Sequence, residues 1–79
     1  MIDRLVGEKV IGIKQSKKAI ESGKGTVLYV AKDTEKKLIS SLIELALKNE
    51  IKVIEIDTMK NLGKMCGIDV KCSATLLLK

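Results

Sequence analysis

The chain has 79 residues, of which 46% are hydrophobic, and this suits one domain with one modest core. Tyr29 is its single aromatic residue, so the core must be aliphatic, and the exposed rings on which many single-strand RNA binders stack bases are missing. Fifteen basic and ten acidic residues give a formal net charge of +5, which favours a polyanionic partner.

The first expected elements are a short strand and a polar helix. Residues 1–9 are mixed in character, and we expect at most a partial helical turn there. Residues 10–11 form a short apolar strand that Gly12 interrupts. A helix then runs over about residues 14–22, where a glycine just beyond its end is typical of a helix stop.

The middle of the chain predicts a buried strand followed by an amphipathic helix. Residues 26–31, TVLYVA, are a continuous apolar run of β-forming residues, typical of a central strand covered on both faces. We expect Asp33 or Thr34 to cap the next helix, which continues to about residue 48. Its wide apolar stripe is typical of a helix packed on a sheet. The stripe consists of Leu38, Leu42 and Leu45, with Ile39, Ile43 and Ala46 beside them.

The last part of the chain predicts a strand, a short helix and a final strand. The first strand covers residues 52–56, and Thr58 is positioned to cap a helix at 59–66. The final strand covers 72–78, which leaves residues 67–71, GIDVK, as a loop.

This β-α-β-α-β-α-β order predicts an α/β protein, a three-layer α/β/α sandwich formed by residues 1–79 as a single domain. Right-handed crossovers make some strand pairs parallel, and we expect a mixed, four-stranded central sheet. Glu55 within its strand indicates an edge or partly exposed position for that strand.

Residues 10–18, VIGIKQSKK, carry the clearest functional signal. A helix that begins there directs free N–H groups and a positive dipole end at its surroundings. Lys14 and Lys18 lie one turn apart, Lys17 adds charge, and Gln15 can both donate and accept hydrogen bonds. Lysines at this spacing often form only a solvated face, and the glycine pattern is not that of an NTPase phosphate loop. We predict an anion-binding surface that reads base edges of a structured RNA.

The loop at residues 67–71 is the second candidate. It combines Ile68 and Val70 with Asp69 and Lys71. Apolar residues in a short loop are often plugs into the core. Alternatively, they stay partly exposed and pack against an extruded base or sugar, with Lys71 at a phosphate.

Two cysteines and no histidine are too few soft ligands for a structural zinc site. The spacing of Cys66 and Cys72 leaves a disulfide open. No apolar run resembles a signal peptide or a membrane span, so we expect a cytoplasmic protein with both thiols reduced and buried. No nucleophile–base pair, metal cluster or cofactor loop is visible. We therefore expect no enzyme, no metal, no cofactor and no membrane.

Four blocks of the sequence, in order and at matching spacing, resemble a known family: GIKQSKKAIESG, LYVAKD, MKNLGKMCGI and IDVKCSATLLL. The chain is similar to the kink-turn-binding ribosomal protein family of L7Ae and L30e, especially its small bacterial YbxF-type members, over about residues 10–78. The resemblance implies an α/β/α sandwich. It also implies binding to kink-turns, which are RNA duplexes sharply bent at a short bulge beside tandem sheared G·A pairs.

The resemblance also implies roles for individual residues. The family motif Gly-x-Asn-Glu-x-x-Lys falls on Gly12, Lys14, Gln15 and Lys18, where Lys14 and Gln15 replace the Asn and Glu of archaeal and eukaryotic members. This helix start would enter the groove at the G·A pairs, with Lys14 and Gln15 near guanine edges. The family's second contact loop, whose apolar side chains cover the unstacked bulge nucleotide, falls on Ile68, Asp69, Val70 and Lys71.

Together these observations predict a monomer that binds a kink-turn in ribosomal RNA or a riboswitch. Gln15 would discriminate the G·A edges, and Ile68 and Val70 would select the bent shape. An alternative is a protein–protein adaptor within a ribonucleoprotein particle. The expected phosphate contacts come from five lysines: Lys14, Lys17, Lys18, Lys64 and Lys71.

Overall fold

The computed structural model describes residues 8–68 and 70–78, so the partial turn expected near the N-terminus and the loop residue Asp69 lie outside the described residues. All seven expected elements are present, with boundaries within about two residues of those predicted. They are β1 (Lys9–Ile11), α1 (Ile13–Glu21), β2 (Val27–Ala31), α2 (Lys36–Lys48), β3 (Lys52–Ile56), α3 (Met59–Met65) and β4 (Ala74–Leu77).

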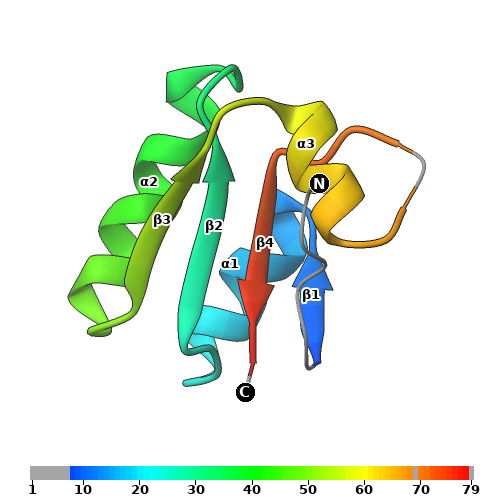
Figure 1. The fold of residues 1–79 in the computed structure, drawn as a ribbon. Helices are drawn as coiled ribbons and strands as arrows, with labels where there is room; N and C mark the ends of the chain where they lie inside the picture. The colour runs from blue at the N-terminus through cyan, green and yellow to red at the C-terminus, as the bar shows by residue number, and fades with distance from the viewer. Residues whose placement is uncertain (1–7, 69, 79) are drawn as a thin grey trace.

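The four strands form one mixed sheet in the order β1-β4-β2-β3 (Figure 1). Strands β2 and β3 are parallel, whereas β4 is antiparallel to both β1 and β2. The predicted central position of the TVLYVA strand is confirmed, because β2 lies between β4 and β3. The position of β3 at the sheet edge, with Glu55 exposed, confirms the interpretation of that carboxylate.

The two faces of the sheet are covered by different helices, which confirms the sandwich. Successive side chains of a strand point to opposite faces. In β2, Leu28 and Val30 are fully buried in a core shared with α1 and α2, whereas Tyr29 and Ala31 pack with residues of α3. Accordingly, α1 and α2 lie behind the sheet in Figure 1 and α3 lies in front.

The predicted apolar stripe of α2 is confirmed except at Leu38, and its residues Ile43 and Leu45 are partly buried against the core. Ile39, Leu42 and Ala46 are buried, whereas Leu38 is 52% exposed and does not face the core. Leu38 is in the first turn of the helix, beside the buried residues of the stripe. Of the described helices, α2 is the longest at 13 residues, and none of them is long and apolar enough to cross a membrane.

The caps of the helices also show one correct and one wrong prediction. The Thr58 hydroxyl caps α3 by accepting a hydrogen bond from the Asn61 N–H at 3.0 Å. Asp33 does not cap α2, because its carboxylate accepts from the Met59 N–H at 2.8 Å and so also serves α3. The parallel strands β2 and β3 have their carboxyl ends at the same end of the sheet. Asp33, which follows β2, therefore lies close to the start of α3, which follows β3. Thr34 is buried and does not cap α2 either.

Candidate nucleic-acid interface

The turn between β1 and α1 depends on Gly12. Its φ angle of 105° lies in a region that favours glycine. Its N–H donates to the Ala74 carbonyl at 2.9 Å, and its own carbonyl accepts from the Ser16 N–H at 3.0 Å. Gly12 therefore makes a hydrogen bond to β4 through its N–H and the first hydrogen bond of α1 through its carbonyl. These two bonds fix the start of α1 relative to β4.

The first turn of α1 presents positive charge and hydrogen-bond donors. Ser16 and Ile20 are buried and hold the helix against the sheet. Among the described residues no side chain caps this helix, and its first turn contains no acidic residue. The N–H groups there and the positive end of the helix dipole are thus not neutralised locally. The predicted contact residues of this helix are all exposed: Lys14, Gln15, Lys17 and Lys18.

The two apolar residues of the second candidate segment behave differently from each other. Ile68 is half-buried and packs against the core beneath α3, as a plug would. Val70 is 68% exposed, and Lys71 is also exposed. The alternative of an exposed apolar contact therefore fits Val70 better than Ile68.

Close packing against α3 fixes the backbone around Val70. Gly63 is buried in α3, and a Cβ added there would collide with the Val70 carbonyl oxygen. The Ile68 N–H donates to the Gly63 carbonyl at 3.1 Å, and the Cys72 N–H donates to the Met59 carbonyl at 3.0 Å. The loop between α3 and β4 thus rests directly on the helix.

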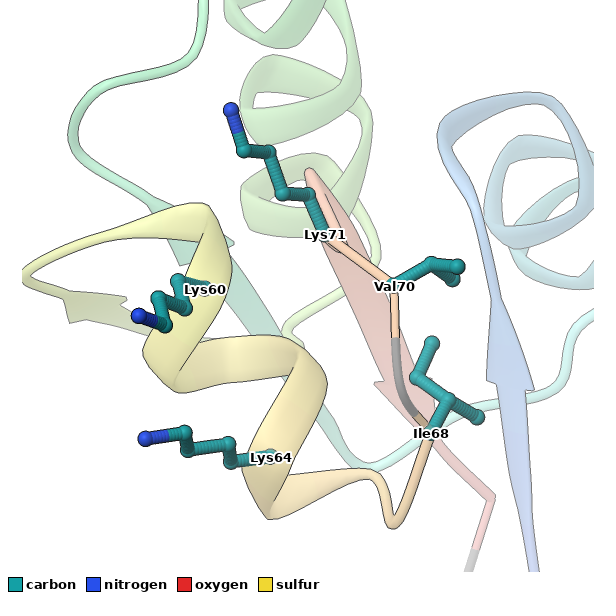
Figure 2. Close-up of a pocket in the computed structure, with 5 residues that line it drawn as sticks. All are labelled: Lys60, Lys64, Ile68, Val70 and Lys71. Atoms are coloured by element: carbon teal, nitrogen blue, oxygen red, sulfur yellow. The ribbon is translucent and has the colours of Figure 1, made fainter.

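Next to this loop is a cleft of about 400 Å³. Two aliphatic side chains and three ammonium groups line it, a combination suited to a nucleotide with its phosphates. Lys60 and Lys64 project from the same side of α3, while Val70 points away from them, towards the side where β1 runs into α1 (Figure 2). Lys60 was not among the predicted residues, although its position one helical turn before Lys64 is the signal that could have identified it. The lining residues are Lys60, Lys64, Ile68, Val70 and Lys71.

The two predicted segments lie at the same end of the sheet. Strands β1 and β4 are antiparallel, and Ile11 at the end of β1 pairs with Thr75 near the start of β4. The start of α1 and the loop that leads into β4 therefore leave the sheet together (Figure 1). Because α1 and α3 are on opposite faces, the lysines of α3 extend this surface around the end of the sheet.

Beneath this surface, two thiols share one hydroxyl group. The Cys66 and Cys72 sulfurs lie 2.9 and 3.0 Å from the Thr75 Oγ1, and the Cys72 thiol donates to the Ala74 carbonyl at 3.1 Å. Both cysteines are free thiols in this structure, and their predicted burial is confirmed. Burial raises the pKa of the Cys66 thiol, although its hydrogen bond with Thr75 partly opposes this.

Comparison with known proteins gives a consistent result. The model of the ribosomal protein L7Ae/L30e/S12e/Gadd45 family matches residues 6–79. An RNA-binding protein of Caldanaerobacter subterraneus is 41% identical over 70 residues, which are 89% of this chain and 85% of that protein. The RNA-binding protein YbxF of Geobacillus stearothermophilus is 36% identical over 73 residues, which are 92% of this chain and 89% of that protein.

A solved structure shows the same fold. The Giardia lamblia 15.5kD RNA binding protein superposes with a TM-score of 0.84 at 18% identity. The superposition covers 90% of this chain and 60% of that one. These likenesses confirm the resemblance that the four sequence blocks carry.

Proposed function

The chain belongs to the ribosomal protein L7Ae/L30e/S12e/Gadd45 family, and we propose that it is an RNA-binding protein that recognises a kink-turn and stabilises its kinked form. The observation that carries this proposal is the shared location of two unlike surfaces. A polar, positively charged helix start and an exposed aliphatic side chain lie at one end of the sheet. A sharply bent RNA with an unstacked nucleotide offers a groove to the helix start and that nucleotide to the aliphatic side chain, whereas a plain duplex has no unstacked nucleotide to offer.

The helix start reads the G·A pairs. Gln15 is exposed in the first turn of α1, where its amide reaches into a groove and forms hydrogen bonds with base edges. Lys14 and Lys18 flank it and donate to guanine acceptors or to phosphates. The uncapped N–H groups of the first turn add further donors for anionic groups.

The loop before β4 recognises the bulge. Val70 covers an unstacked nucleotide with its exposed aliphatic side chain. The lysines around the adjacent cleft, Lys60, Lys64 and Lys71, contact the phosphates on either side of that nucleotide. Because only the kinked RNA makes both sets of contacts, binding shifts the RNA population towards the kinked form. This is a binding function that needs no catalytic group.

A bending assay with two RNAs tests this proposal. Donor and acceptor dyes on the two arms of a kink-turn report bending, and titration gives the dissociation constant. We expect the kink-turn to bind about tenfold or more tightly than a variant without the G·A pairs, since one good base contact contributes about 1–3 kcal/mol. Equal affinity for the two RNAs would contradict kink-turn recognition. Binding to neither, together with a protein partner that is retained after nuclease treatment, would favour an adaptor.

A further inference from the structure

The two cysteines bracket the segment that carries Val70 and Lys71. Cys66 is the C-cap residue of α3, and Cys72 lies two residues before β4. Both are buried, with 8% and 2% of their surfaces exposed. Any change in how these cysteines are joined therefore acts on both ends of the loop.

One arrangement of protons satisfies all three contacts of the cluster. The Cys72 thiol donates to the Ala74 carbonyl. Its sulfur then accepts from the Thr75 hydroxyl, whose oxygen accepts in turn from the Cys66 thiol. These hydrogen bonds hold both sulfurs on the same hydroxyl group while both thiols remain reduced.

From this geometry we propose that Cys66 and Cys72 form a reversible disulfide, and that this modification changes the loop and weakens RNA binding. The effect on RNA rests on the proposed function, whereas the disulfide and the change in the loop do not. The oxidant is a peroxide or a small-molecule disulfide. The product is a ring closed across the base of the loop.

The chemistry with hydrogen peroxide is balanced. One cysteine sulfur, as the thiolate, breaks the O–O bond and becomes a sulfenic acid, which releases one water. The second sulfur attacks the sulfenic sulfur and forms the S–S bond, which releases a second water. Two thiols lose two electrons, and one peroxide is reduced to two waters. A thiol reductant reverses the step by exchange.

Formation of the disulfide removes a contact that now holds the ends of the loop. An S–S bond is about 2.05 Å long, whereas each sulfur now contacts the Thr75 oxygen that both share. At least one sulfur leaves that hydroxyl group when the bond forms, and the segment between the cysteines is then closed in a ring. The Val70 carbonyl is packed tightly against Gly63, so we expect the backbone to adjust by moving Val70 and Lys71 away from α3. Burial and the raised pKa of the Cys66 thiol make oxidation slower than that of an exposed thiol.

The test uses the unaltered chain before and after treatment with hydrogen peroxide. Mass spectrometry of the intact protein and of its peptides should show the loss of two hydrogens and a Cys66–Cys72 link. The dissociation constant for kink-turn RNA should rise about fivefold or more, the lower end of the usual range for coupled sites. A thiol reductant should restore it. Cys66→Ser and Cys72→Ser variants, which cannot form the link, are the matched controls and should show no reductant-reversible change.

Two results would overturn the proposal. One is a folded, peroxide-treated protein in which no Cys66–Cys72 link forms. The other is a linked protein whose loop amides show unchanged hydrogen exchange and whose RNA affinity is unchanged. If the reduced protein shows no preference for kink-turn RNA, the proposed function fails instead. Hydrogen exchange at Ile68, Val70 and Lys71 then still decides whether the disulfide alters the loop.

Discussion

Lys14 and Gln15 are neighbours at the exposed start of α1, yet they differ in what they can recognise. A lysine ammonium only donates hydrogen bonds, so it cannot distinguish one acceptor from another by pattern. The Gln15 amide donates and accepts, and of the four exposed contact residues on this helix it alone does both. Under the proposed function, discrimination between bases by this helix would therefore depend on Gln15, while the neighbouring lysines would supply charge.

We therefore expect Gln15→Ala to cost about 1–3 kcal/mol of binding free energy on kink-turn RNA and much less on a plain duplex. The substitution removes a base-edge contact but leaves every lysine in place. Titration of both RNAs with the variant measures the difference. Lys48→Ala, in the last turn of α2, is the control and should alter neither affinity. Equal losses of binding free energy on the two RNAs would show that Gln15 does not discriminate base edges.

At the scale of the elements, the sequence predicted what local patterns decide. The Gly12 break, the Thr58 cap and the β-forming run of β2 each follow from neighbouring residues, and each is present. The wrong or missing predictions involve contacts between distant segments. Asp33 caps α3 and not α2 because two parallel strands end side by side. The tight contact of Gly63 with the loop has no local signal at all.

That contact supplies a prediction for α3. Gly63→Ala adds a methyl group where the Val70 carbonyl already lies. The gain in helix propensity is about 1 kcal/mol, whereas overpacking of a tight contact costs about 1–3 kcal/mol. We expect a net loss of stability of up to about 2 kcal/mol. Since the loop must move to relieve the collision, we also expect weaker binding to kink-turn RNA.

Denaturant unfolding and RNA titration of the same preparation test both effects. Ser41→Ala, at an exposed position of α2, is the control for a small substitution in a helix. It should leave both measurements within error of the unaltered protein. A Gly63→Ala protein that is more stable and binds RNA normally would show that the contact has room to relax.

At the scale of the whole molecule, the order of elements along the chain was predictable, but their order in the sheet was not. Apolar periodicity identifies each strand but not its neighbours. Strand β4 is last in the chain, yet it inserts between β1 and β2. This insertion places the loop that carries Val70 beside the start of α1. The meeting of the two candidate segments therefore depends on long-range strand pairing, which the periodicity of each segment alone could not predict.

The chain has a formal net charge of +5, and lysines of both candidate segments lie at one end of the sheet. If the five predicted lysines each contact a phosphate, the logarithm of the association constant should fall with the logarithm of salt concentration at a slope of about −4 to −5. Replacement of one contact lysine, as in Lys64→Ala, should reduce the magnitude of the slope by about 1.

The Lys60→Ala variant tests whether RNA contacts the cleft beside α3 as well as the start of α1. If phosphates enter the cleft, this variant should also reduce the slope by about 1, because Lys60 lines it together with Lys64 and Lys71. Lys48→Ala should leave the slope unchanged, since that lysine is in the last turn of α2, at the other end of the sheet. A series of titrations between low and moderate salt measures all three proteins. A salt-independent affinity, or the same slope for all three variants, would show that these lysines are not held against RNA phosphates.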